Sequence, residues 1–348
     1  MKIILLYVLS PRFYKGFTIG IFTLLLWNCK SKPASTREIS SVSIDTILSE
    51  KISIRALLLD NGNIWYGADN GRYGKVDLKS KARTAFTAPA NMSGEFRSIA
   101  NTSDGIFILN AGTPAQLFRI DKKTNKTRLC YSESFDKTFY DSMTFWNDVD
   151  GIAIGDPVED CLSIILTRDG GFTWKKTECA DLPKVFDGEA AFASSNTNVV
   201  VKANSAWIVS GGKKSRVFRT NDKGNTWKVY DTPIIQGSSM TGIFSADFYN
   251  ESIGIVAGGD YQQPTLAIGN KAISTDGGST WNLVAENNGF GYASCIQYNP
   301  FRDGREIVSV GATGVWYSSD GGQSWTQVST DKDLYTIRFK DAKTAYAA

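Results

Sequence analysis

Short runs of apolar and β-branched residues recur in pairs along the chain, separated by glycine, aspartate and asparagine. Met143–Trp146 followed by Gly151–Gly155 is one pair, and Gly242–Ser245 followed by Ser252–Gly258 is another. Runs of this length and composition predict β-strands. We expect no long helix after residue 28, so the pattern indicates an all-β protein.

The paired runs repeat with a regular period. Units begin near residues 54, 96, 143, 190, 242, 293 and 335, a spacing of 42 to 52 residues. Each unit has room for four short antiparallel strands, which is the content of one β-propeller blade. The sequence therefore predicts a single β-propeller of four-stranded antiparallel blades over residues 42–348, with seven blades, or six as the alternative.

The seventh unit stops after its second run, Thr344–Ala348. Propellers usually close by pairing the last blade with a strand from the other end of the chain, because this leaves no exposed sheet edge. We expect Val42–Ile47 to be that closing strand. Even so, the last blade is expected to be one strand short, which would fit a truncated C-terminus.

Four units carry the same eight-residue motif, Ser/Thr-x-Asp-x-Gly-x-Thr/Ser-Trp. Its aspartate can accept backbone N–H groups of a tight turn, its glycine supplies the positive φ, and its tryptophan begins the next strand with a large apolar face. We therefore expect structural roles for Asp169 and Trp174, Asp222 and Trp227, Asp276 and Trp281, and Asp320 and Trp325. The motif resembles the Asp-box, or BNR repeat, of sialidases, sortilin-like receptors and other β-propellers.

The first 28 residues differ from the rest of the chain. They contain three basic residues and no acidic one, and the apolar run Gly16–Trp27 suits the core of a signal peptide but is too short to span a membrane. Cys29 then resembles the lipidated cysteine of a bacterial lipobox. We expect 1–28 to be a leader outside the propeller, Cys29 to be lipidated, and 29–41 to be a tether. An ordinary signal peptide or an uncleaved anchor is the alternative, giving a membrane-anchored, secreted or periplasmic protein.

Composition excludes several kinds of chemistry. The formal net charge is +3, and loss of Lys2, Arg12 and Lys15 with the leader would reduce it to 0, which argues against nucleic-acid binding. The chain has no histidine, so histidine-dependent catalytic triads and histidine-ligated metals are impossible. No dinucleotide-binding glycine motif follows a strand. We expect no cofactor and no metal.

Two cysteines flank the first motif at nearly equal distances. If Thr167 faces Thr173 in that hairpin, Cys161 faces Cys179, and facing strand positions bring Cβ atoms within disulfide reach. Export would permit oxidation. The sequence predicts a Cys161–Cys179 disulfide, with two buried thiols as the alternative.

Propeller topology indicates where a ligand would bind. The loops that enter each unit and those after its second strand share one face, opposite the motif turns. Residues expected around a funnel there include Asp69, Glu159 and Asp160. The candidates for acid–base chemistry are Asp141, Asp156, Asp187, Glu189 and Asp260, and those for binding are Arg55, Arg97, Tyr261, Tyr292, Tyr335 and Arg338.

The four motifs, the Gly151–Gly155 type of second strand and the single-ring size resemble the photosystem II stability/assembly-factor-like propellers over about residues 50–348. The resemblance implies a scaffold, since its photosynthetic members bind a partner membrane protein during assembly. The resemblance to sialidases is weaker, because their Phe/Tyr-Arg-Ile-Pro signature is absent. The nearest match, Phe118-Arg-Ile120, is followed by Asp121 instead of proline. We expect a monomeric cell-envelope scaffold that binds a protein or glycan without catalysis. A glycan-active hydrolase is the alternative, and an oxidoreductase, by family label alone, is weaker still.

Overall fold

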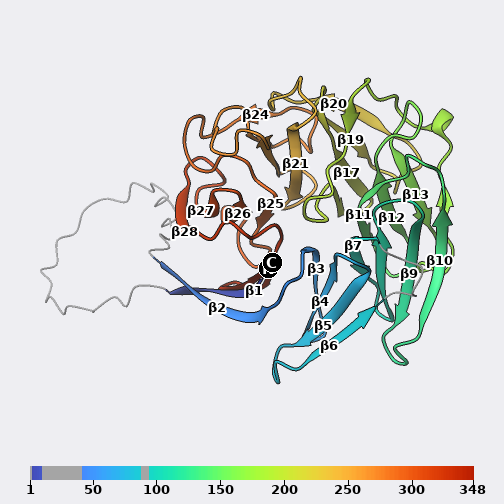
Figure 1. Cartoon of the computed structure of the whole chain (residues 1–348). Coiled ribbons are helices and arrows are strands. Elements are labelled where there is room, and N and C mark those ends of the chain that lie inside the picture. Colours follow the sequence, from blue (N-terminus) through green and yellow to red (C-terminus); the bar gives the residue numbers. More distant parts are fainter. Residues whose placement is uncertain (1, 10–40, 88–93) are drawn as a thin grey trace, which may run out of the picture.

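The computed structural model describes residues 2–9, 41–87 and 94–348, and within them seven β-sheets surround a central axis (Figure 1). Apart from one turn of 3-10 helix, Cys179–Asp181 (η1), every regular element in these ranges is a strand. The predicted all-β, seven-bladed propeller is confirmed, and the six-bladed alternative is excluded. No helix in these ranges is long and apolar enough to cross a membrane.

The first three blades follow the chain in order, from the axis outward. They comprise β3 (Ile54–Asp60), β4 (Asn63–Ala68), β5 (Arg72–Asp77) and β6 (Arg83–Thr87); β7 (Phe96–Asn101), β8 (Gly105–Asn110), β9 (Ala115–Asp121) and β10 (Thr127–Glu133); and β11 (Tyr140–Phe145), β12 (Gly151–Gly155), β13 (Ser163–Thr167) and β14 (Lys175–Lys176).

Blades four to six continue the ring. Their strands are β16 (Val199–Lys202), β17 (Ser205–Val209), β19 (Arg216–Thr220) and β20 (Lys228–Asp231); β21 (Thr241–Phe248), β22 (Gly254–Asp260), β23 (Lys271–Ser274) and β24 (Asn282–Leu283); and β25 (Cys295–Tyr298), β26 (Ile307–Gly311), β27 (Gly314–Ser318) and β28 (Thr326–Ser329). Two short strands, β15 (Glu189–Ala190) and β18 (Gly211–Gly212), extend the sheet of blade five.

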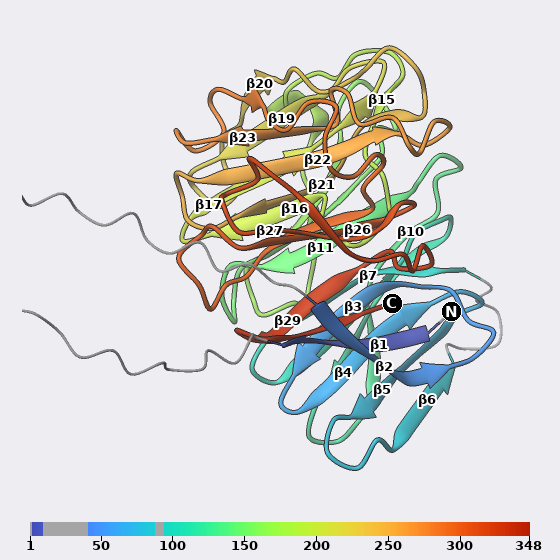
Figure 2. The same cartoon turned by 90° about the vertical axis from the view of Figure 1, so that its left-hand side faces the viewer.

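The seventh blade joins the two ends of the chain (Figure 2). Its order is β29 (Ile337–Asp341), β30 (Thr344–Ala347), β1 (Lys2–Leu9) and β2 (Ser41–Ser49), so the expected closing strand Val42–Ile47 lies within β2. β1 supplies the strand that the sequence left missing, because it pairs with both β30 and β2. The blade is therefore complete, with four strands.

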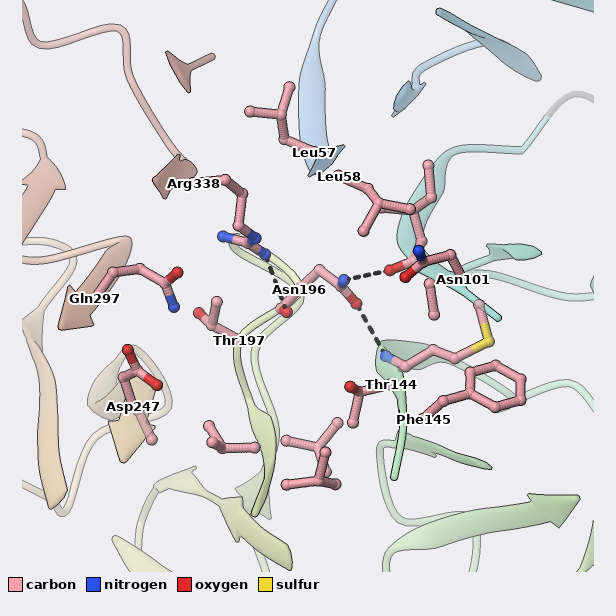
Figure 3. A pocket seen from close by; sticks show the side chains of 17 residues that line it. Leu57, Leu58, Asn101, Thr144, Phe145, Asn196, Thr197, Asp247, Gln297 and Arg338 are labelled. Carbon is pink, nitrogen blue, oxygen red and sulfur yellow. Dashed lines mark hydrogen bonds between the residues drawn. The ribbon is translucent and has the colours of Figure 1, made fainter. Parts of the chain in front are cut away.

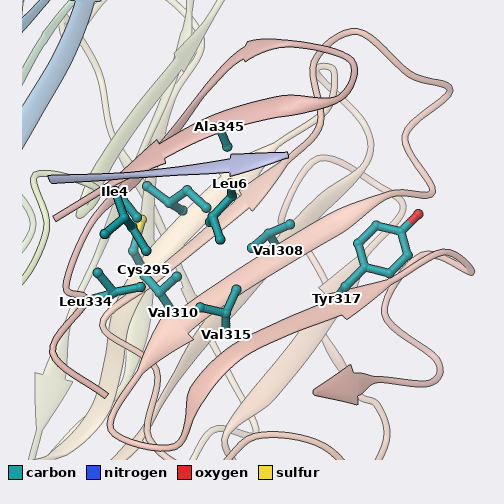
Figure 4. Packing of buried hydrophobic residues seen from close by; sticks show 11 residues of the cluster. Ile4, Leu6, Cys295, Val308, Val310, Val315, Tyr317, Leu334 and Ala345 are labelled. Atoms are coloured by element: carbon teal, nitrogen blue, oxygen red, sulfur yellow. The ribbon is translucent and has the colours of Figure 1, made fainter. Parts of the chain in front are cut away.

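The position of β1 differs from the expectation that the whole 1–28 segment lies outside the ring. Lys2–Leu9 is apolar enough to serve as a strand between two packed blades. Ile4 and Leu6 pack against Val308, Val310 and other buried residues of the neighbouring blade (Figure 4). Cys29 and most of the leader and the tether lie outside the described residues, so lipidation and export stay predictions.

The core of the molecule lies between the blades. The four motif tryptophans fill these spaces: Trp174, for example, packs in one cluster with Phe107 of the preceding blade. Its ring N–H donates to the carbonyl of Gly171 at 3.3 Å, and the other three motifs repeat this bond. Large aromatic faces buried between blades stabilise the ring by the hydrophobic effect.

The aspartate of each motif organises its turn. Asp276 accepts the backbone N–H of Thr280 at 2.9 Å and its hydroxyl at 2.7 Å, while the Ser274 hydroxyl donates to the same carboxylate at 2.8 Å. These hydrogen bonds, led by that of the Thr280 hydroxyl, lower the pKa of Asp276 to about 2. The carboxylates of Asp169, Asp222 and Asp320 make the corresponding bonds.

The structure joins Cys161 to Cys179 by a disulfide with a Cα–Cα distance of 5.7 Å, which is the pairing the sequence predicts. The strand register behind that prediction is off by one residue, since Ile165 faces Lys176 in the hairpin. Both cysteines lie beyond the paired part of β13 and β14, Cys161 in an isolated bridge with Lys184 and Cys179 at the start of η1.

Candidate functional site

The two faces of the ring carry different structures. Inner strands begin on what we call the upper face and end on the lower face. Because the four strands of a blade alternate in direction, the loop after the second strand lies on the upper face and the motif turn between the third and fourth lies on the lower face. Loop residues on the upper face are therefore the first candidates for a binding site.

A β-bulge near the start of the inner strand recurs in four blades. The strand register skips one residue between Ile54 and Ala56, and again at the same place in blades two, three and five. A bulge bends the strand and redirects the side chain of the extra residue. The extra residues are Arg55, Arg97, Asp141 and Phe244, three of which the sequence placed at the funnel.

These bulges help to build a group of cationic and aromatic side chains that we call the upper cluster: Arg55, Arg97, Phe192, Phe244, Tyr261, Tyr292 and Tyr335. The guanidinium carbon of Arg55 lies 3.5 Å from the ring centroid of Tyr335. Burial is the main cause that lowers the pKa of Arg55, and the positive charge of Arg97 adds to it. The cluster thus holds a desolvated cation at the axis.

Aromatic rings complete the other side of the upper cluster. Phe192 stacks on Phe244 at 3.9 Å between centroids, and Phe244 meets the edge of Tyr292 at 4.7 Å. Tyr292 in turn contacts the exposed Tyr261 at 5.1 Å. The predicted binding residues Arg55, Arg97 and the three tyrosines are thus brought together, whereas Arg338 lies elsewhere, as described below.

Two of the predicted carboxylates lie near each other, one buried and one half-buried. Asp141 is fully buried, and neither of its oxygens has a hydrogen-bond partner among the described residues. Burial, followed by the nearby Asp156, raises the pKa of Asp141 well above its ordinary value. Burial also raises the pKa of Asp156 to about 6, although its carboxylate accepts the N–H of Ala191 at 3.0 Å. Each of these two acids therefore holds its proton to a higher pH than an exposed aspartate does.

The other predicted carboxylates have different surroundings. Glu189 is buried in an ion pair with Arg216, with 2.6 Å between Oε2 and Nη2. Asp260 accepts the backbone N–H groups of Gln262 and Gln263 at 2.8 and 3.3 Å, so it stabilises a turn. Asp187 is exposed and lines a cleft of about 570 Å³ on the upper rim together with Asp156 and Glu189. With Asp156, which accepts the Ala191 N–H, three of the five predicted carboxylates therefore have structural partners.

A polar segment, Ala193–Asn198, crosses the axis where an inner strand was expected; we call it the plug. Blade four was expected to begin near residue 190, but its inner strand begins at Val199. Small hydroxyl and amide side chains replace the apolar residues that inner strands carry elsewhere, as in Ala56–Leu59. This polar composition is the signal that sequence reasoning missed.

Hydrogen bonds tie the plug to five other blades. From blade two, Arg97 donates to the Ala193 carbonyl at 2.9 Å, and from blade three, the Met143 N–H donates to the side-chain oxygen of Asn196 at 2.9 Å. From the plug, the hydroxyls of Ser194 and Ser195 donate to carbonyls of blades five and six at 3.1 and 2.7 Å. Blade seven contributes Arg338, which donates to the Ser195 carbonyl at 3.1 Å. The plug therefore forms a floor beneath the upper cluster.

On the lower side of the plug lies a cavity of about 230 Å³, which we call the lower chamber (Figure 3). Asp247, Gln297 and Arg338 stand on one side of it, and Leu58, Thr144 and Phe145 on the other, with Asn196 and Thr197 of the plug between them. The carboxylate of Asp247 accepts the backbone N–H groups of Phe248 and Tyr298, each at 2.8 Å. Burial raises the pKa of Asp247.

Comparison with known proteins gives structural neighbours alone. No family model matches the chain. No curated protein matches it at sequence level. YCF48 from Cyanidioschyzon merolae is similar in structure, with a TM-score of 0.61 at 13% identity over 86% of this chain and 94% of that chain. YCF48 bound to D1 peptide gives 0.58 at 14% identity, covering 85% and 93%. The Pan2 WD40 domain of Neurospora crassa gives 0.59 at 12%, covering 85% and 88%. The fold of this chain is thus one that it shares with YCF48 and with WD40 β-propellers.

Proposed function

We propose that this protein is a non-catalytic scaffold whose upper cluster binds an acidic segment of a partner protein. The observation that carries the proposal is the state of Arg55. Its guanidinium is half-buried, its Nε has no hydrogen-bond partner in the described chain, and none of the ion pairs within 4.0 Å in those residues involves it. A desolvated cation without a counter-ion is stabilised by a carboxylate of a ligand.

The neighbouring side chains fit such a ligand. Tyr335 is half-buried and Tyr261 is 47% exposed, so their surfaces are open to a partner, whereas the guanidinium of Arg97 is paired with Glu95 at 2.6 Å. Tyrosine and arginine are the residue types that most often dominate protein–protein binding energy. The plug supports the cluster from below, which favours docking onto a preformed surface over passage through the ring.

Structural neighbours support binding as the function. One of them is YCF48 bound to D1 peptide, others are the WD40 domains of RRP9 and Pan2, and another is a chain of a mitotic checkpoint complex. These ligands belong to those proteins. For this chain we propose a protein partner in the cell envelope, with a glycan as the alternative ligand, and a monomer tethered through a lipidated Cys29. A Cys29→Ser variant that still incorporates labelled fatty acid would exclude the proposed anchor.

Site-specific photo-crosslinking tests the scaffold proposal. A photoreactive amino acid at Tyr261 should give a covalent adduct with a polypeptide in living cells. The same amino acid at Gln323, an exposed position of a motif turn on the lower face, is the matched control. The Arg55→Gln variant should lose the adduct, and a purified Arg55→Gln protein should bind acidic peptides at least tenfold more weakly than wild type. Adducts that do not depend on Arg55 would refute the proposal.

Glycan hydrolysis is a second candidate function, and a single observation favours it. Asp156 lines the cleft on the upper rim, and its pKa of about 6 suits a general acid. If this acid acts on a glycan, Asp156→Asn should abolish turnover of any hydrolysed substrate while Asp260→Asn, a change in a turn, leaves it measurable. Equal turnover by wild type and Asp156→Asn would exclude a catalytic role for this acid.

A further inference from the structure

The lower chamber is separate from the upper cluster. The plug lies between them, and its residues Asn196 and Thr197 line the chamber. A volume of about 230 Å³ is below the roughly 300–1,000 Å³ of sites for drug-sized ligands. The chamber therefore has room for a small molecule or a single long side chain.

The walls of the chamber differ in polarity. Blades one to three contribute a largely apolar side, including Leu57, Leu58, Ile99, Met143 and Phe145. Blades five to seven contribute Asp247, Gln297 and Arg338, which face this apolar side in Figure 3. Such a cavity fits a ligand with a polar head and a short apolar body.

The charged groups decide which polar head fits. Arg338 uses its guanidinium on protein groups: it donates to the Ile337 carbonyl at 2.8 Å, the Thr336 hydroxyl at 3.0 Å and the Ser195 carbonyl at 3.1 Å. These hydrogen bonds fix the guanidinium against the plug. The amide of the half-buried Gln297 has no such bond to the described protein groups, so it is available to a ligand.

Asp247 is in a different state. Its two oxygens each accept one backbone N–H, which fixes the carboxylate and leaves further lone pairs at the chamber. Lys202 and Arg338 act on it only as more distant charges, and no ion pair within 4.0 Å is formed with it in the described chain. A fixed carboxylate at a cavity attracts a cation that can donate several hydrogen bonds.

We propose that the lower chamber binds a protonated primary amine on a short alkyl chain. Asp247 and Gln297 accept hydrogen bonds from the ammonium, and the apolar side covers the alkyl chain. The same chemistry occurs in a free alkylamine and in a lysine side chain of a polypeptide. This site is independent of the proposed scaffold function, since it lies on the other side of the plug.

Calorimetric titration of the purified protein with n-pentylammonium, pentan-1-ol and pentanoate tests the proposal. Pentylammonium should bind at least tenfold more tightly than the alcohol or the carboxylate, since only the cation gains from Asp247. A tripeptide with a central lysine and blocked ends distinguishes the two sources: binding as tight as that of pentylammonium indicates a polypeptide, and weaker binding indicates a free amine. Equal affinities for the ammonium and the alcohol would overturn the proposal.

Charge changes at Gln297 locate the site without disturbing the bonds of Asp247. Gln297→Glu should tighten pentylammonium binding by about tenfold and Gln297→Lys should abolish it. The same pair of changes at Gln262, an exposed residue of the upper face, is the matched control and should have no effect. Asp247→Asn should remove the preference for the cation. If the Gln297 variants bind like wild type, the amine does not occupy this chamber.

Discussion

Lys271 lies at the start of β23 with no exposed surface, which is unusual for a lysine. Its ammonium donates to the side-chain carbonyl of Asn270 at 2.9 Å and lies 4.9 Å from the ring centroid of Phe290. Burial, opposed only in part by the distant charge of Glu286, lowers the pKa of Lys271 from 10.5 to about 8. This buried amine therefore destabilises the fold when it is charged.

The magnitude follows from proton linkage. A difference of about 2.5 between the folded and unfolded pKa values corresponds to about 3 kcal/mol, at 1.36 kcal/mol per unit. Between pH 8 and 10.5 the unfolded chain holds the proton that the folded chain has lost. The free energy of unfolding should therefore rise with pH through this window, whereas below pH 8 the full penalty is present.

Lys271→Met removes the charge and keeps the length of the side chain. We expect it to raise the free energy of unfolding at pH 7 by about 2 kcal/mol, which is the linkage penalty less about 1 kcal/mol for the lost hydrogen bond. The advantage should shrink as the pH approaches 10.5. Urea unfolding followed by tryptophan fluorescence at several pH values measures both effects.

The difference in the pH dependence of stability between wild type and Lys271→Met isolates the titration of Lys271, because the titrations of Cys130 and the tyrosines are common to both proteins. Lys228→Met, at an exposed position of β20, is the control and should change stability little at any pH. If wild type and Lys271→Met show parallel pH dependences, the argument from burial is wrong.

Three further predictions test other parts of the structure. Asp141→Asn should stabilise the protein at pH 7 and have little effect at pH 4. The pKa of Asp141 is raised in the folded protein, so the wild type loses stability as the pH rises above about 4, and the variant does not. Thermal unfolding at both pH values measures this. Reducing the Cys161–Cys179 disulfide should lower the free energy of unfolding by about 3 kcal/mol, because the bond closes a loop with an 18-residue separation. Denaturant unfolding with and without reductant measures the loss. The Cys161→Ser/Cys179→Ser variant is the control and should not respond to reductant. Glu189→Gln should cost about 3 kcal/mol, since it leaves Arg216 buried without a counter-ion, whereas Glu189→Gln/Arg216→Met should recover part of the loss in the same assay.

Much of the architecture was predictable because each blade repeats the same local physics. The motif turn brings Asp276 and Thr280 together within five residues, so its register can be read from the chain. Once the phase of the repeat is known, the face that carries Arg55 and Arg97 follows from strand direction alone. The disulfide was predictable for the same reason, even though the expected register was off by one residue.

Non-local contacts account for what could not be predicted. Thr336 donates to the carbonyl of Ser195 across 141 residues, and no local pattern encodes this bond. The pairing of Lys2–Leu9 with β30 joins opposite ends of the chain, so its apolar sequence was interpreted as part of a leader. Asp247 lies at the lower end of an inner strand, where a polar residue is typical of a turn. Arg338 was expected at the funnel because the repeat places it on a strand at the axis. The repeat does not reveal the plug that crosses the axis and accepts a hydrogen bond from Arg338.

The plug changes how the ring resists unfolding. In a simple repeat protein each unit contacts its two neighbours, and stability is nearly a sum of nearest-neighbour energies. Here a single segment binds five non-identical blades, so it acts as a hub whose bonds form only when those blades are in place. Loss of one blade should weaken the rest through this hub, making unfolding all-or-none, and opening the ring at blade seven should not suffice to separate the blades.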